Sequence, residues 1–305
     1  LISDLFYIFL VSIVFYLTLH IKSNKIIYIP SGGVNSTVSY LSKNSYDINI
    51  LDNYIIRLIG TPQKGWINFK STTITKADFI YKLTKAKAAT KIIKLLPGET
   101  YHFLLIQLSK ELNLSINKLL SSYKKYRYKL DGNILAESYN IPIGMSENNV
   151  ISFMINYSNK KHEEYSKKIF KKYNKKEWFK YIIIASIIQK ESATIEEMPI
   201  ISSVIYNRLK KGMRLQMDGT LNYGKYSHDK DLYKRIRSDN SSYNTYKVKG
   251  LPKNPICAVS FNSIKAAVNP KKTNYLFFVK KRYENSHIFS SNYTTHKLNI
   301  KKNKI

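Results

Sequence analysis

The sequence predicts an α+β protein in three parts: an N-terminal transmembrane helix, a small α/β module and a C-terminal α+β domain. Three observations lead to this fold class. Residues 5–21 form an uncharged apolar run. A strand, a Pro/Gly turn and a helix then follow one another twice, about 65 residues apart. Finally, an apolar helix near residue 181 precedes a polar region that ends in a short apolar strand.

The apolar run at residues 5–21 predicts a membrane anchor. At about 1.5 Å per residue it crosses most of a bilayer, and Leu1 and Ile2 extend it. A cleaved signal peptide is the alternative, but the following IKSNKIIY has no small-residue cleavage site. A buried soluble helix is disfavoured because the run has no polar face. Charge leaves the orientation open, since Lys22 and Lys25 alone only weakly favour a cytoplasmic body.

The composition excludes two classes of protein. The chain has 305 residues, a formal net charge of +30 and 44% hydrophobic residues, which is too apolar for intrinsic disorder. A single cysteine, Cys257, excludes a disulfide scaffold. The charge suggests nucleic-acid binding, but the Lys-rich residues 159–176 lack an organised set of stacking aromatic residues. We expect a solvated helix and connector there.

Two segments carry the strand–turn–helix pattern of the module. Residues 26–29 are a β-branched run that stops at a proline, and residues 91–96 are a second run before a Pro-Gly turn and a helix over 103–112. From these patterns we divide the chain into an anchor, a module, a connecting region and a C-terminal domain, at residues 1–22, 23–120, 121–175 and 176–305.

The apolar helix that contains Tyr181 ends in a carboxylate, Glu191. Three isoleucines share its helix face at spacings of three and four residues: Ile184, Ile187 and Ile188. A carboxyl group among isoleucines loses hydration when charged, so its pKa rises, as a general acid near neutral pH requires. The alternative is a glutamate at a helix end that faces water. We expect the neighbouring glutamates at positions 196 and 197 to face solvent.

A polar loop follows the next helix, which is expected to end at Gly212. Its amide, hydroxyl and aromatic groups suit a polyhydroxylated ligand, and they belong to Gln216, Asp218, Thr220 and Tyr223. The alternative is a turn whose polar groups bond its own backbone, as Asp-Gly does readily. The sequence has no zinc-binding, phosphate-binding or nucleophile-elbow motif. Metal-dependent, nucleotide-dependent and acyl-transfer chemistry are therefore not indicated.

Several segments together resemble the endolytic murein transglycosylases, the MltG or YceG-like family. IASIIQKES resembles the family's helix whose last glutamate is catalytic, and YNRLKKGMRLQMDGTLNYG resembles its YNRL–GM-LQ-DPT–YG segment. YNTYKVKGLPKNPIC resembles the YNTY–GLP–PI segment, and SIKAAVNPKKTNYLFFV with SHIFS resembles the closing stretch. LDGNILAESYNIP is a fainter match, and the strand–turn–helix repeat is similar to a LysM-like module. The resemblance is strong over residues 181–296 and weaker before them.

Two departures from the family pattern concern the site. Gln189 stands where many members have a glutamate, so the catalytic assignment falls on Glu191. Gly219 stands where the DPT motif has proline, and we expect this change to loosen the loop.

The resemblance implies non-hydrolytic cleavage of glycan strands between N-acetylmuramic acid and N-acetylglucosamine, leaving a 1,6-anhydro end. Glu191 would protonate the departing oxygen and then, as a carboxylate, take the proton of the sugar's own C6 hydroxyl. Asp218 is a candidate for stabilising the positively charged transition state, and His287 is expected to be structural. The candidates for orienting the sugars are Asn207, Gln216, Asp218, Thr220, Tyr223, Tyr243 and Asn244. No metal ligand or cofactor is expected.

The resemblance also implies a location and partners. The substrate lies outside the bacterial inner membrane, so we expect a single-pass protein with its catalytic body in the periplasm. Glycan strands of peptidoglycan, the inner membrane and cell-wall synthases are the expected partners, with no nucleic acid. Cleavage within nascent strands would limit or terminate their elongation. One alternative is a non-catalytic peptidoglycan-binding or scaffold protein of cell-wall synthesis, and another is nucleic-acid binding driven by charge.

Overall fold

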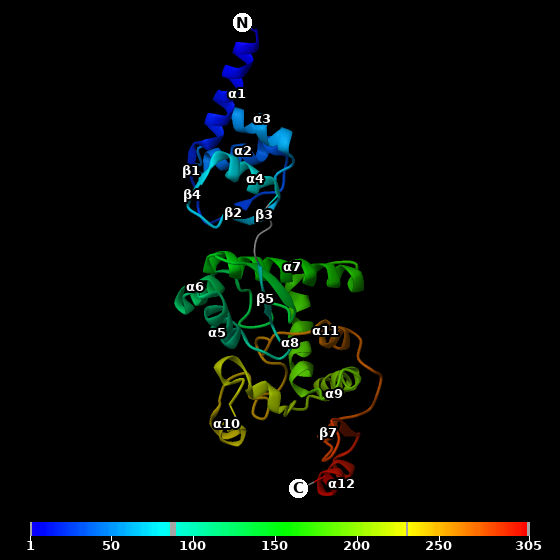
Figure 1. Ribbon diagram of the computed structural model, residues 1–305. Coiled ribbons are helices and arrows are strands. Elements are labelled where there is room, and N and C mark those ends of the chain that lie inside the picture. The colour runs from blue at the N-terminus through cyan, green and yellow to red at the C-terminus, as the bar shows by residue number, and fades with distance from the viewer. Residues whose placement is uncertain (1, 86–89, 230, 304–305) are drawn as a thin grey trace. The chain divides into compact units, whose positions relative to one another are not determined.

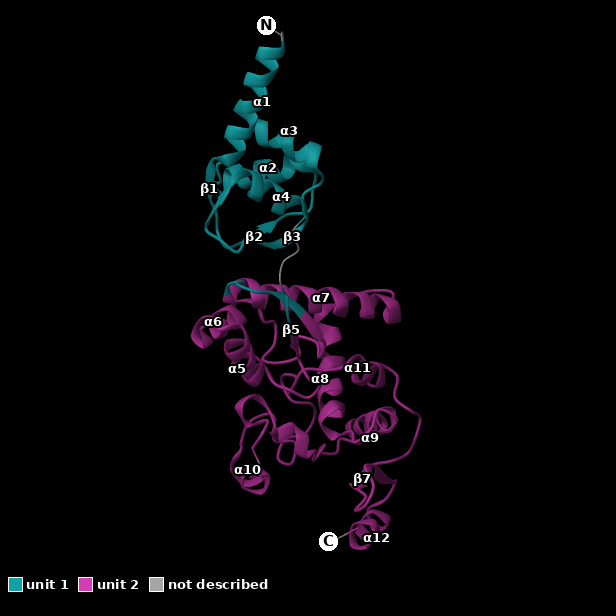
Figure 2. Cartoon of the chain, in the orientation of Figure 1, with its two compact units in different colours: residues 1–92, 140–146 teal, residues 93–139, 147–305 magenta. Residues whose placement is uncertain are grey.

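The computed structural model describes residues 2–85, 90–229 and 231–303. The chain forms two compact units (Figure 2). Unit 1 comprises residues 1–92 and 140–146, and unit 2 comprises residues 93–139 and 147–305. Helices and two-stranded sheets occur in both units (Figure 1). The α+β class expected from the sequence is therefore confirmed.

Unit 1 begins with helix α1 (Ile2–Thr18) and strand β1 (His20–Lys22). A β-α-α-β segment follows, made of β2 (Ile26–Ile29), α2 (Val34–Lys43), α3 (Ile50–Ile59) and β3 (Gly65–Asn68). Strand β4 (Thr73–Thr75) and helix α4 (Lys76–Lys85) complete the unit. Strand β1 pairs antiparallel with β4, and β2 with β3. Their inward side chains form one apolar core with α2, α3 and α4.

The N-terminal apolar run does not continue as helix to Ile21. Helix α1 ends at Thr18, and Ile21 is a fully buried residue of strand β1, where it pairs with Ile74. Hydropathy did not separate these residues, because a buried strand is as apolar as a membrane helix. No helix within the described ranges has both the length and the apolar character needed to span a membrane. Leu1, which was expected to extend the anchor, lies outside the described residues.

A second β-α-α-β segment contains β5 (Thr90–Lys94), α5 (Tyr101–Leu112), α6 (Ile116–Tyr126) and β6 (Ser138–Pro142). Strand β5 is hydrogen-bonded to β6 in a two-stranded sheet. Both strand–turn–helix elements expected from the sequence are therefore present. The 24-residue helix α7 (Glu147–Phe170) follows, and it includes most of the expected Lys-rich connector.

The rest of unit 2 is organised around helix α8 (Lys175–Glu191), which packs against α9 (Met198–Lys210) and α11 (Phe261–Val268). Between α9 and α11 lie two 3-10 turns, η1 (Asp218–Leu221) and η2 (Gly224–Tyr226), and helix α10 (Leu232–Ser238). Strands β7 (Phe277–Lys280) and β8 (His287–Ser290) pair antiparallel, and α12 (Tyr293–Asn303) follows them.

The compact units differ from the segments drawn from the sequence. Boundaries were expected after residues 22, 120 and 175, whereas the compact units divide after residue 92, and residues 140–146 return to unit 1. Helix α5 thus belongs to the unit that contains α8, and strand β1 belongs to the unit that contains the first β-α-α-β segment. The functional roles assigned to the segments stay predictions.

Candidate active site

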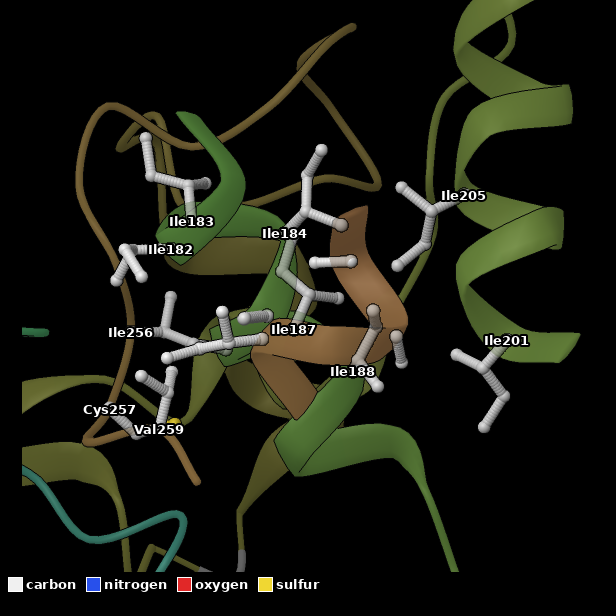
Figure 3. Packing of buried hydrophobic residues seen from close by; sticks show 14 of the residues in the cluster. Ile182, Ile183, Ile184, Ile187, Ile188, Ile201, Ile205, Ile256, Cys257 and Val259 are labelled. Atoms are coloured by element: carbon white, nitrogen blue, oxygen red, sulfur yellow. The ribbon is translucent and has the colours of Figure 1, made fainter. Parts of the chain in front are cut away.

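Helix α8 carries Glu191 as its last residue. The helix begins at the cap Asn174, whose side chain accepts a hydrogen bond from Glu177 N. Its middle is packed from several sides, because its isoleucines lie between Ile201 and Ile205 of α9 and the segment around Ile256 and Val259 (Figure 3). This packing fixes the end of the helix. The carboxylate that ends it is therefore presented from a rigid element.

The carboxyl group of Glu191 is held by one backbone donor. Gly219 N–H donates a hydrogen bond of 2.7 Å to Glu191 Oε1. Burial raises the pKa of Glu191 to about 7, and the negative charge of Asp218 adds to this rise, while the Gly219 hydrogen bond and the Arg208 cation oppose it. The expectation of a raised pKa at this residue is consistent with its surroundings. Such a group holds its proton near neutral pH and can release it.

Gly219 allows this arrangement because it has no side chain. A Cβ at this position would lie 2.6 Å from Lys190 Cβ and 2.8 Å from Glu191 Oε1. Gly219 is buried in turn η1 and is absent from the glycines with positive φ, so space rather than backbone angle favours glycine. The glycine thus brings the loop into contact with the end of α8.

Glu191 lines a cleft of about 430 Å³. One wall comes from α8, α9 and the loop after α9, and the other from β7, β8 and α12. The lining residues are Glu191, Arg208, Leu215, Gln216, Asp218, Tyr246, Phe277, Phe278, Val279, Lys280, His287, Tyr293 and His296. Two carboxyl groups, two cationic side chains and several aromatic rings therefore line one cleft.

Two of the seven proposed sugar-orienting residues lie in this cleft, Gln216 and Asp218. Gln216 is exposed and has a φ of 48°, a left-handed conformation that is uncommon for glutamine. Its backbone is held in place because Gln216 N donates to Thr245 O at 3.1 Å. Asp218 is also exposed, and Tyr246 OH donates a hydrogen bond to Asp218 Oδ1.

The structure does not bring the other five candidates to the cleft wall, and their polar groups bond within the protein. Asn207 Nδ2 donates to Thr273 O at 2.9 Å and to Tyr275 O at 3.0 Å, which fixes the chain before β7. The fully buried Thr220 and Asn244 bond the loop's own backbone and side chains. Tyr223 and Tyr243 stack on each other with ring centroids 4.0 Å apart. A direct role of these five in sugar binding stays a prediction.

Arg208 and Tyr246 are among the lining residues that were not singled out from the sequence. The Arg208 guanidinium is 7% exposed, and it donates from Nε to Leu276 O and from Nη1 to Leu215 O, each at 2.6 Å. It therefore ties the two walls of the cleft together. Burial and the neighbouring Asp218 raise the pKa of Tyr246, so its hydroxyl stays a donor. Both residues lie in the motifs YNRL and YNTY, which was the available signal.

A histidine–carboxylate pair lies on the opposite wall. His287 Nδ1 is 2.8 Å from Glu197 Oε2, and His287 N–H donates to Glu197 Oε1. Glu197 is 7% exposed, so the expectation that it faces solvent is wrong, whereas Glu196 is exposed as expected. The reason is a partner 90 residues away that local sequence does not reveal.

Gln189 takes part in packing rather than in the cleft. Its Oε1 accepts a hydrogen bond of 2.7 Å from Ser260 Oγ, the cap of α11.

Across the described ranges, no group of three or more His, Cys, Asp or Glu side chains is arranged to hold a metal ion.

Comparisons with known proteins agree with the resemblance seen in the sequence. The sequence profile of the YceG-like family matches residues 28–302. An endolytic murein transglycosylase of Bacillus subtilis is 36% identical over 194 residues, which cover 63% of this chain and 52% of that protein. The endolytic murein transglycosylase of Streptococcus pneumoniae serotype 2 is 29% identical over 179 residues, or 57% of this chain and 32% of that protein.

The fold is also similar to a solved structure. A crystal structure of a yceG-like protein from Listeria monocytogenes superposes with a TM-score of 0.59 at 23% identity. The superposition covers 91% of this chain and 99% of that one. The chain spans about half the length of the curated B. subtilis relative it matches. Since the family profile extends over nearly the whole chain, the protein belongs to the YceG-like family.

Proposed function

We propose that the chain is a lytic transglycosylase that cleaves peptidoglycan strands within their length. The observation that carries this proposal is Glu191, a carboxyl group with a pKa of about 7 at the wall of a cleft. The curated relatives, endolytic murein transglycosylases by name, support the same reaction class.

Glu191 would act on the bond between N-acetylmuramic acid and N-acetylglucosamine. Its proton passes to the departing glycosidic oxygen, and the carboxylate that remains is one group able to accept the proton of the C6 hydroxyl. That hydroxyl attacks the anomeric carbon of its own sugar, so no water is consumed and a 1,6-anhydro end is formed. Attack within one ring has a large proximity advantage over a captured water.

The cleft offers the remaining contacts that this reaction needs. Exposed Asp218 lies close enough to Glu191 to raise its pKa, and its negative charge would stabilise an oxocarbenium-like state. Phe277, Phe278 and Tyr293 line the cleft, and an aromatic ring exposed there can stack on a sugar face. Gln216 and Lys280 supply amide and ammonium donors for hydroxyl and acetamido groups.

Helix α1 would attach the protein to the cytoplasmic membrane. Seven apolar side chains of this helix are between 56% and 67% exposed, and contact between so much apolar surface and water is unfavourable. They belong to Leu5, Phe6, Ile8, Phe9, Val11, Val14 and Phe15. With a single-pass anchor, the catalytic body would lie on the outer side of this membrane, where the glycan strands are made. In a bacterium with two membranes this compartment is the periplasm. The β-α-α-β segments serve as LysM-like modules, and cleavage of nascent strands beside cell-wall synthases would limit their length.

The decisive experiment compares the protein with Glu191→Gln on purified murein. The parent is expected to release muropeptides with 1,6-anhydro ends, detected by mass spectrometry, and E191Q is expected to release at least about 1,000-fold less because it has no proton to donate. E191Q should still cosediment with murein. Release by E191Q at the parental rate would refute the assignment, and binding without release by both proteins would favour a scaffold role.

A further inference from the structure

His287 and Glu197 form a largely buried pair that is joined by two hydrogen bonds. Both oxygens of Glu197 accept hydrogen bonds from His287, one from the ring Nδ1 and one from the backbone N–H. Each side chain is 10% exposed, so water competes little for these bonds. Glu197 precedes helix α9 and His287 begins strand β8, so the pair also fastens β8 to the core helices.

This geometry fixes the tautomer of the imidazole. A carboxylate has no donor, so Nδ1 of His287 must carry the proton that lies between the two groups. In the neutral ring, Nε2 then holds a lone pair. Nε2 makes no hydrogen bond within residues 2–85, 90–229 and 231–303, and His287 lines the same cleft as Glu191. Nε2 is therefore the ring nitrogen left to accept a proton.

The other charged or titratable groups of the cleft are less suited to this task. The Arg208 guanidinium and the Lys280 ammonium have no lone pair. Carboxylates are as a class weaker bases than imidazoles, and Asp218 Oδ1 accepts the hydroxyl of Tyr246, which remains protonated. His296 stacks on Phe277 with ring centroids 5.0 Å apart, and among the described residues no carboxylate bonds its Nδ1 to fix the tautomer. In His287, by contrast, the hydrogen bond from Nδ1 to the buried Glu197 carboxylate leaves Nε2 as the acceptor.

We propose that His287 is the base that removes the proton of the attacking C6 hydroxyl, and that Glu197 is its positioning residue. The inference rests on the proposed transglycosylase function and divides between two residues the roles otherwise given to Glu191. The bond from C1 of the muramic acid to the glycosidic oxygen breaks, and that oxygen takes the proton of Glu191. The C6 oxygen bonds to C1, and its proton passes to His287 Nε2. Release of that proton to solvent and uptake of one by Glu191 restore both groups.

Glu197→Gln is the sharpest variant because it changes no shape. The backbone N–H of His287 can only donate, so it takes the single oxygen of the new amide, and the amide NH₂ then faces Nδ1. The ring must accept there and carry its proton on Nε2, which removes the base. On murein strands, E197Q and H287Q are each expected to lower kcat by about 100-fold or more with little change in KM. His228→Gln is the matched control, since His228 is paired at 3.1 Å with Glu99 on the surface and is 57% exposed. It should behave as the parent.

A second substrate separates the two roles of Glu191 without altering the pair. The probe is a muramic-acid-containing oligosaccharide with a 4-nitrophenyl leaving group, which needs no protonation. If His287 is the base, E191Q stays within about tenfold of the parent on this probe, whereas H287Q and E197Q lose about 100-fold on it as well. E191Q inactive on the probe, or E197Q with parental kcat on strands, would overturn the base assignment. A parent that gives no anhydro ends from strands would instead refute the proposed function.

Discussion

Each compact unit holds a carboxylate among packed helices, and the two differ in whether a cation is paired with them. In unit 1, Asp52 is fully buried, and its Oδ2 accepts from Lys76 Nζ at 3.2 Å and from Asn49 N at 2.8 Å. In unit 2, Glu191 accepts one hydrogen bond from Gly219, and it forms no salt bridge within the described residues. One carboxylate is neutralised by a cation, and the other is left to hold a proton.

The lysine of unit 1 shows how completely the first charge is neutralised. Lys76 is 1% exposed, and its ammonium also donates to Tyr16 OH at 2.9 Å and to Asp47 O at 3.0 Å. Burial alone would lower the pKa of Lys76, but Tyr16 and Asp52 outweigh it and raise the pKa above its ordinary value. A buried carboxylate with a counter-ion thus stabilises the structure, whereas a buried carboxyl group without a counter-ion has the raised pKa that catalysis can use.

Removing Lys76 should give the largest loss of stability among the variants considered. Lys76→Met leaves Asp52 as an unpaired buried charge, and we expect unit 1 to lose about 3–5 kcal/mol of stability. Hydrogen exchange over residues 20–85 and denaturant unfolding would measure this loss. The double variant with Asp52→Asn removes the second charge as well and should recover most of it. A loss below about 1 kcal/mol in K76M would mean that solvent reaches Asp52.

The unpaired carboxylate predicts how activity depends on pH. Glu191 must be protonated to donate, and its pKa is about 7. The rate of anhydro-end formation should therefore fall by about tenfold per pH unit above pH 7, or about 100-fold by pH 9. Initial rates from pH 5 to pH 9 test this, with circular dichroism at pH 9 as the folding control. A rate that stays level from pH 7 to pH 9 would show that the proton of Glu191 is not required.

The contact between Gly219 and Glu191 can be broken by one methyl group. Gly219→Ala would place a Cβ 2.8 Å from Glu191 Oε1, so the carboxyl group must move and lose its backbone donor. We expect kcat to fall by about tenfold, measured on murein strands. Gly33→Ala is the control, because nothing lies within 4 Å of a Cβ built there. An unchanged kcat in G219A would show that the carboxyl position tolerates the shift.

The sequence predicted those parts of the fold that local periodicity encodes. The spacing of Ile184, Ile187 and Ile188 led to Glu191, although α8 is buried on all sides over residues 182–188. The first strand, turn and helix of each β-α-α-β segment were expected from local signals, whereas the second helix and the closing strand were not. The end of α1 could not, because Ile21 is equally apolar in a membrane helix and in the buried strand that it occupies.

The site was predicted less well because its second wall is distant in sequence. His287 and Glu197 meet across 90 residues, and nothing in either segment alone indicates the pair. Thr220 and Asn244 illustrate the opposite error. Their polar side chains suggested a ligand, yet both are fully buried and bond the loop that they belong to. Polar residues in a loop can serve the loop itself, and only burial distinguishes the two uses.

The smallest expected effect concerns the hydroxyl that holds Asp218. Tyr246→Phe removes the hydrogen bond to Asp218 Oδ1 but leaves its charge, so kcat/KM should fall by about threefold through looser positioning alone. Asp218→Asn instead removes the charge that raises the pKa of Glu191, so its alkaline limb should move to lower pH. Parallel pH–rate profiles of the two variants separate positioning from charge. If Y246F moved the limb as far as D218N, the tyrosine would act on the proton affinity of Glu191 and not merely on geometry.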